Sequence, residues 1–121
     1  MLFRSVLDQM YTALVDDLQE RGLLDSTLVV VMGEMGRTPR VNQNAGGRDH
    51  WPQCGFILLT GGRVKRGMVY GKSDKHGAYP VENPVSSADH VATIYQLLGI
   101  DPHLIVNDLA EIGRASCRER V

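Results

Sequence analysis

Residues 33–53 gather side chains of the kinds that bind metal ions. The stretch contains two carboxylates, three arginines, a histidine and the single tryptophan of the chain. Carboxylate oxygens combined with an imidazole nitrogen suit zinc, manganese or another divalent ion. The candidate metal ligands are Glu34, Asp49 and His50.

The arginines of the same stretch indicate a second kind of chemistry. Each guanidinium is a planar fork of N–H donors that matches the oxygens of a sulfate or phosphate group. The candidate anion-binding residues are Arg37, Arg40 and Arg48. A metal ion and these arginines together would polarise a sulfate or phosphate ester and stabilise the charge that develops on its oxygens.

Each candidate also has a purely structural interpretation. Glu34 can pair with a nearby arginine, His50 can be a satisfied buried histidine, and the arginines can form a solvated surface. In a structural loop of this kind, Arg37 and Arg48 would pair with Glu34 and Asp49. Neutralising either carboxylate would then destabilise the fold rather than remove a ligand.

Three further histidines lie outside this stretch. His76 and His103 fall in polar segments, and we expect both to be exposed. His90 follows Asp89 in a predicted helix. We expect it on the helix surface rather than as a metal ligand.

Two apolar runs flank the charged stretch and must position it. Residues 27–32 and 55–60 are short and continuously apolar, which is typical of strands covered on both faces in a parallel α/β sheet. The stretch between them is much longer than the usual connection of about 4 to 6 residues. It begins at the carboxyl end of a strand, where open α/β sheets bind their ligands. Both observations predict a functional loop.

Two amphipathic helices are predicted outside these strands. Apolar residues recur at spacings of three and four over about residues 2–21, which predicts a helix that stops at Gly22. A second helix is expected to begin after Ser86 or Ser87, whose hydroxyl can accept a backbone N–H bond, and to end at Gly99. Helices alternating with strands predict the α/β class.

The segment between the second strand and the second helix is mostly polar. Gly61 and Gly62 predict a turn after the strand. Residues 68–70 read as an edge strand, and residues 71–84 read as a polar loop.

Composition restricts the possible partners. The chain has 121 residues, 43% hydrophobic and 22% charged, which is ordinary for one globular domain or a part of one. A net charge of -1 gives no reason to expect nucleic acid or an anionic membrane as a partner, so any basic patch must be local. No apolar run approaches the roughly 20 residues of a membrane span.

The end of the chain and the cysteines carry little information. Residues 111–121, EIGRASCRERV, have no apolar period, and we interpret them as a non-native tail. Cys54 and Cys117 are far apart and in no CxxC spacing, so we expect one core thiol and one tail thiol.

Several motifs resemble those of one protein family. TLVVVMGEMGRTPR, GRDHWP and PVSSADHVATIYQLLGIDP look like the carboxy-terminal part of the domain of unknown function 1501 family. The resemblance covers about residues 3–110, with GRTPR followed by GRDHWP as its most specific part. That family is sulfatase-like and similar to the alkaline-phosphatase superfamily. The resemblance implies that residues 1–110 are a carboxy-terminal fragment of an α/β/α sandwich.

The resemblance also assigns roles to residues of the charged stretch. Glu34 stands where sulfatases have a metal-binding aspartate, and His50 is similar to the histidine that precedes their next strand. These positions imply a divalent metal, namely zinc, manganese, calcium or magnesium. Met35 departs from the pattern, because it stands where sulfatases have a His or Asn ligand. Either Asp49 supplies the missing ligand or orients His50, or the site is degenerate.

The activity implied is metal-dependent hydrolysis of sulfate or phosphate esters, on a small molecule or a glycan. The nucleophile of that superfamily belongs to an amino-terminal portion that nothing here matches, so this chain would be inactive alone. The alternative is a non-catalytic protein on the same fold that binds anions or glycans through its arginines. The resemblance implies an exported parent protein, periplasmic or secreted, but this chain itself does not indicate a compartment.

Overall fold

The computed structural model describes residues 6–44, 46–101 and 103–104. The predicted tail, residues 111–121 with Cys117, lies outside the described residues. The chain divides into two compact units, Met1–Val69 and Tyr70–Val121, which are described separately below. No helix in the described part of the chain is long and apolar enough to cross a membrane.

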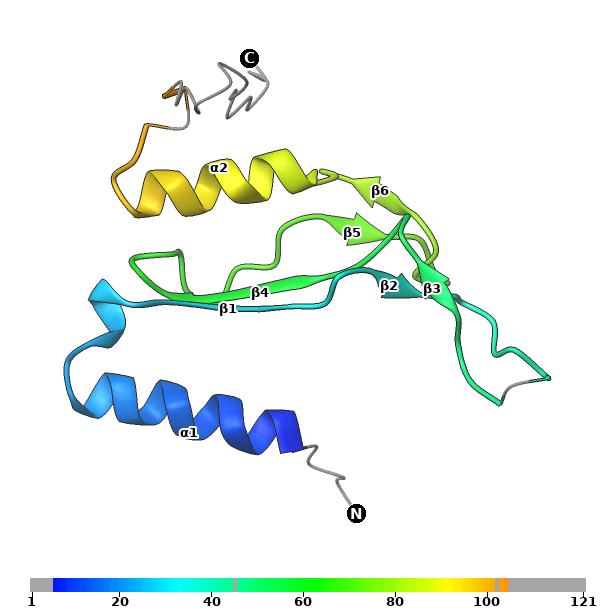
Figure 1. Ribbon diagram of the computed structural model, residues 1–121, viewed down its shortest axis with the longest axis horizontal. Coiled ribbons are helices and arrows are strands. Elements are labelled where there is room, and N and C mark those ends of the chain that lie inside the picture. Colours follow the sequence, from blue (N-terminus) through cyan, green and yellow to red (C-terminus); the bar gives the residue numbers. More distant parts are fainter. Residues whose placement is uncertain (1–5, 45, 102, 105–121) are drawn as a thin grey trace, which may run out of the picture. The chain divides into compact units, whose positions relative to one another are not determined.

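The first unit opens with helix α1, Val6–Glu20, followed by a short 3-10 helix η1, Leu24–Ser26 (Figure 1). The helix predicted over about residues 2–21 is confirmed from Val6 onward. It ends at Glu20, one residue before the predicted end. Gly22 has φ +68°, the left-handed conformation that commonly follows a helix end. This turn redirects the chain toward the first strand.

Strands β1, Leu28–Met32, and β4, Ile57–Gly61, pair with each other in an antiparallel ladder. Leu28 lies opposite Gly61, and Met32 lies opposite Ile57. The expectation of parallel strands is wrong for this pair. Residues 33–56 fold back on themselves and return the chain to the end of β1 from which it left, so β4 runs in the opposite direction.

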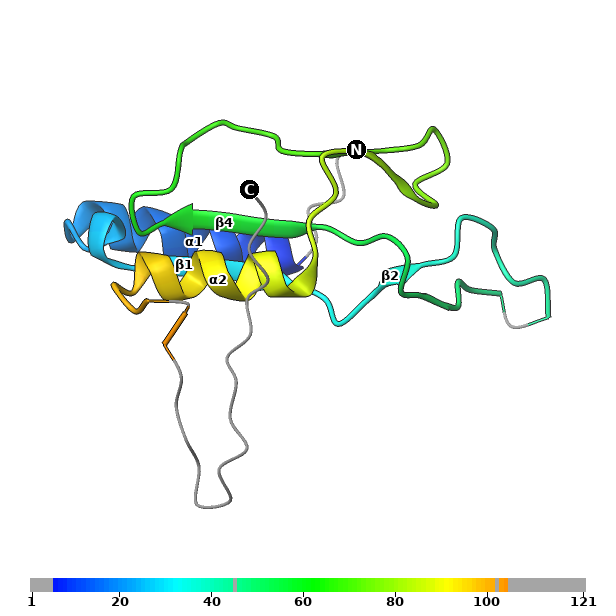
Figure 2. The same ribbon diagram turned by 90° about the horizontal axis from the view of Figure 1, so that it is seen from above.

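Helix α1 lies against one face of the β1–β4 pair. Val29, Val31, Leu58 and Thr60 share this face, because side chains alternate along a strand and directly opposed residues point the same way. The hydroxyls of Tyr11 in α1 and Thr60 in β4 form a hydrogen bond. Both views show the helix running alongside the two strands (Figures 1 and 2).

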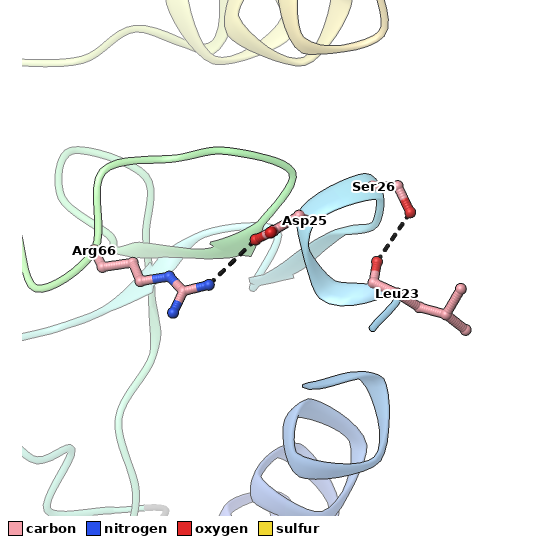
Figure 3. Close-up of polar contacts among 4 residues, drawn as sticks. All are labelled: Leu23, Asp25, Ser26 and Arg66. Atoms are coloured by element: carbon pink, nitrogen blue, oxygen red, sulfur yellow. Dashed lines mark hydrogen bonds and ion pairs between the residues drawn. The ribbon is translucent and has the colours of Figure 1, made fainter. Parts of the chain in front are cut away.

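The end of β4 packs tightly on η1. Gly61 has φ +76°, and a Cβ there would lie 2.5 Å from the carbonyl oxygen of Leu24. Leu24 is the one buried apolar side chain among the described residues, with 6% of its surface exposed. Beyond β4, the Arg66 guanidinium donates to the Asp25 carboxylate at 3.2 Å, while the Ser26 hydroxyl bonds Leu23 within η1 (Figure 3).

The charged stretch forms a long two-stranded arm (Figure 2). Strands β2, Gly36–Arg37, and β3, His50–Trp51, are antiparallel, and an isolated bridge joins Asn42 to Gly47 further out. A ladder this short leaves no alternating pattern in the sequence. The sequence therefore predicts a loop without secondary structure for this segment.

The second unit contains a small hairpin and helix α2. Strands β5, Lys72–Ser73, and β6, Pro80–Glu82, are antiparallel. The predicted edge strand at residues 68–70 is wrong, since the first strand beyond β4 begins at Lys72. A turn centred on residues 74–79 supplies the reversal, and the Lys72 ammonium pairs with the Glu82 carboxylate at 2.9 Å.

Helix α2, Ser87–Leu97, confirms the predicted capping. The Ser86 hydroxyl accepts from the Asp89 N–H, while the Asp89 carboxylate accepts from the Ser86 N–H at 2.8 Å. Gly99 ends the helix with φ +74°. These signals are local in sequence, which explains why they could be predicted.

The expected surface position of His90 is wrong. His90 is buried, with 7% of its surface exposed, whereas Val91 is 41% exposed. Ile94 shares the buried side, since residues four apart lie on one helix face. The buried stripe of α2 is therefore rotated toward His90. Helices combined with small antiparallel sheets place the chain in the α/β class.

Candidate functional site

The base of the β2–β3 arm requires a glycine. A Cβ on Gly36 would overlap the carbonyl oxygen of Cys54 and lie 3.0 Å from that of Trp51. The backbone of β2 therefore runs unusually close to the segment that follows β3. This contact fixes the position of the backbone at Arg37, the next residue of β2.

Arg48 holds the arm together. Its Nη1 donates to the carbonyl oxygens of Thr38 and Pro39, both at 2.8 Å. The Thr38 N–H donates to the Asp49 carbonyl at 3.0 Å, and the Asp49 N–H donates to the Thr38 hydroxyl at 3.1 Å. One of the three predicted anion-binding arginines therefore has a structural partner in the backbone.

Asp49 orders the outer part of the arm. Its two carboxylate oxygens accept from the Asn42 amide at 3.3 and 3.2 Å. The Asn42 N–H donates to the Gly47 carbonyl at 2.6 Å, and the Asn42 side chain accepts from the Asn44 N–H at 3.0 Å. This carboxylate is thus directed at an amide and at the turn rather than at His50.

Arg37 and His50 lie directly opposite each other across the β2–β3 pair. Opposed residues of an antiparallel pair have Cβ atoms about 4.5–5.5 Å apart on one face. Both side chains are exposed. The Arg37 guanidinium makes one long hydrogen bond, 3.4 Å from its Nη1 to the Arg48 carbonyl oxygen, so most of its N–H donors face solvent.

The arginine–carboxylate pairing that the purely structural interpretation predicts is not found among the ion pairs of the described residues. Among the described residues, the ion pairs join Arg21 to Asp17, Arg66 to Asp25 and Lys72 to Glu82. Arg37, Arg40 and Glu34 are exposed and belong to none of these pairs. The arm therefore presents two guanidinium groups that no carboxylate neutralises within the described part of the chain.

The three predicted metal ligands do not form a group. No three His, Cys, Asp or Glu side chains among residues 6–44, 46–101 and 103–104 are placed to hold a metal ion. The Asp49 carboxylate is bonded to the Asn42 amide, whereas His50 begins β3 opposite Arg37. Glu34 lies in the bend between β1 and β2. These residues do not fit a divalent ion by themselves, so we derive no step through a metal.

A structured carboxylate that the sequence reasoning missed lies in the second unit. The Asp74 carboxylate accepts from the backbone N–H groups of Ala78 and His76, both at 2.9 Å. Hydrogen bonding from Ala78 is the main cause that lowers the pKa of Asp74, and His76 and Tyr79 add to it, whereas partial desolvation opposes the shift. The aspartate followed by a glycine three residues later is an available turn signal. Asp74 is part of a turn rather than of the site.

The remaining histidines add nothing to the arm. His76 and His103 are exposed, as predicted. His90 has a buried Nε2 atom without a hydrogen-bond partner, and it lies in the second unit. Cys54 is a half-buried free thiol at the base of the arm.

Comparison with known proteins returns one family. The family described as "Protein of unknown function (DUF1501)" matches residues 3–114 of the chain. No curated protein and no solved structure matches the chain.

Proposed function

The chain belongs to the DUF1501 family of proteins of unknown function, so we infer its chemistry from its own residues. We propose that the β2–β3 arm recognises sulfate or phosphate esters. Arg37 and Arg40 supply the guanidinium donors for the anion. The His50 imidazole, opposite Arg37, supplies a further hydrogen-bonding group on the same face.

A single observation carries this proposal, namely the different environments of the three arginines. Arg48 is fixed to two backbone carbonyls and thereby orders the segment that bears the other two. All three arginines are exposed, but Arg37 makes a single long bond of 3.4 Å to a backbone carbonyl, and neither Arg37 nor Arg40 belongs to the ion pairs of the described residues. A guanidinium on an ordered backbone segment loses less conformational entropy on binding, which favours recognition of a sulfate or phosphate group.

The proposal takes the non-catalytic form of the two functions expected from the sequence. A metal-dependent hydrolase on an α/β/α sandwich would need a metal site, and the described residues contain no group of three His, Cys, Asp or Glu side chains to support that form. We propose that this chain binds the ester and leaves it intact. Ester hydrolysis stays a proposal for a longer protein that would add a nucleophile and metal ligands.

Calorimetric titration of the 121-residue chain with phenyl sulfate and phenyl phosphate tests the proposal. Charged hydrogen bonds contribute about 1.5–3 kcal/mol each, so the double variant Arg37→Gln, Arg40→Gln should lose at least about tenfold in affinity. Arg21→Gln is the control for removing an exposed guanidinium outside the arm, because Arg21 directly follows α1. It should leave the affinity unchanged.

Added chelator separates the two functions. Anion recognition by arginines continues in chelator, and equal affinity of the double variant and the unaltered chain would refute it. Binding that requires zinc or manganese, and that Glu34→Gln with His50→Ala abolishes, would instead support the hydrolase.

A further inference from the structure

The loop that follows β4 carries a local concentration of positive charge. Arg63, Lys65 and Arg66 lie within four consecutive positions, and all three are exposed. Asp25 of η1 offsets part of this charge through its 3.2 Å ion pair with Arg66 (Figure 3). The side chains of this pair are 70% and 81% exposed, so both remain accessible to a ligand.

Arg63 occupies a backbone position that favours a different residue. Gly62 and Arg63 have φ values of 55° and 66°, and the Val64 N–H donates to the Gly61 carbonyl at 3.1 Å. Two successive positive φ angles inside such a bond define a type I′ turn, whose central positions favour Gly, Asn or Asp. Since glycine would relieve the strain, the turn itself does not explain the arginine. Strain of this kind concentrates at functional sites.

Apolar side chains are exposed directly beyond the cations. Met68 is 53% exposed, and Val69 is 92% exposed. Residues 62–69 form no helix, but they combine the two contributions that govern binding to a bilayer surface, namely attraction of cations to anionic lipids and burial of apolar area. The basic loop and its apolar end are defined here as residues 62–69, which lie within the first unit.

We propose that residues 62–69 dock the protein on an anionic lipid surface. Arg63, Lys65 and Arg66 bind the headgroups, while Met68 and Val69 enter the boundary between headgroups and acyl chains. Charge complementarity selects anionic lipids, and Asp25 weakens the attraction. A dissolved anion would use the cations alone, whereas a lipid surface also accommodates the two apolar side chains.

Sedimentation of the full chain with phosphatidylcholine vesicles, with and without phosphatidylserine, tests this docking. Each cation close to such a surface is worth about fivefold in partitioning at low salt. Arg63→Gly should lower binding about fivefold. The same substitution should raise thermal stability, because glycine suits the turn, so lost binding cannot be attributed to unfolding.

Further variants separate the two parts of the surface. Asp25→Asn should raise binding about fivefold, since it removes the opposing charge. Val69→Asn should lower binding in a way that salt does not alter. Arg21→Gln removes an equal charge from the residue that follows α1, outside the loop, and should have no comparable effect.

Three results would overturn the proposal. The first is that the folded chain does not bind phosphatidylserine vesicles. The second is that Arg63→Gly and Val69→Asn leave vesicle binding unchanged. The third is that inorganic phosphate displaces the chain from the vesicles completely. The last would show a site for small anions instead.

Discussion

The three arginines of the arm show that residues of one type can have unrelated roles. From the sequence, Arg37, Arg40 and Arg48 cannot be distinguished, because each is an arginine in a polar stretch. The structure separates them through backbone contacts that form only once the arm has folded. Arg48 bonds the carbonyls of residues 38 and 39. Which arginine would take this position could not be predicted from composition.

The predicted metal ligands Asp49 and His50 also could not be tested from the sequence alone. Asp49 and His50 are adjacent, and adjacency in a loop permits both side chains to reach one ion. In the folded arm the Asp49 carboxylate instead accepts from the Asn42 amide, while His50 begins β3 opposite Arg37. The sequence gives no strand pattern there, so this restriction became visible only in the structure.

The hydrogen bonds of the Asp74 carboxylate predict that the stability of its turn depends on pH. Its folded-state pKa is lowered, chiefly by the Ala78 N–H, so its ionised form favours the folded turn. This stabilisation is complete above the unfolded value near 3.8 and is lost as pH falls through the lowered folded value. Asp74→Asn should remove it. Amide exchange of Ala78 should then be faster at neutral pH and should change less on acidification; identical exchange in both proteins would contradict this.

At the scale of elements, local signals predicted the structure well. The capping box of α2 and the glycines that end both helices require only a few neighbouring residues. The direction of β4 did not follow from its apolar run, since such a run is compatible with either direction. It depends on how the arm returns the chain, which involves contacts between residues far apart in sequence.

The close backbone contact at the base of the arm makes a prediction for Gly36. Gly36→Ala places a Cβ against the carbonyls of Trp51 and Cys54, so the base must shift. We expect a loss of about 1–3 kcal/mol in the free energy of unfolding, measured in urea. Gly47→Ala is the matched control, since no heavy atom lies within 4 Å of its Cβ position. Equal stability of the two variants would contradict the contact.

At the scale of the whole molecule, two side chains of the described residues are buried, those of Leu24 and His90. Leu24 is the buried apolar residue of the described part, and α1 has no buried residue. The α/β class could be predicted from the order of the elements. Whether these elements belong to an α/β/α sandwich stays a proposal.

Leu24 should therefore contribute an unusually large share of the stability. Leu24→Ala should lower the free energy of unfolding by about 2–5 kcal/mol, the usual range for a buried leucine. Its neighbour Leu23 is 46% exposed, so Leu23→Ala should cost much less. Urea unfolding of both variants measures the difference, and similar losses would show that Leu24 does not anchor the packing of β4 on η1.

Recognition of an anionic ester by the arm is the central claim, and chemical-shift mapping by NMR tests it most directly. Phenyl phosphate and phenyl sulfate would be titrated into the isotope-labelled chain. The account predicts saturable shifts of the side-chain signals of Arg37, Arg40 and His50, with small changes at Arg48. Shifts confined to residues outside the arm, or no saturable shift in a folded chain, would contradict it.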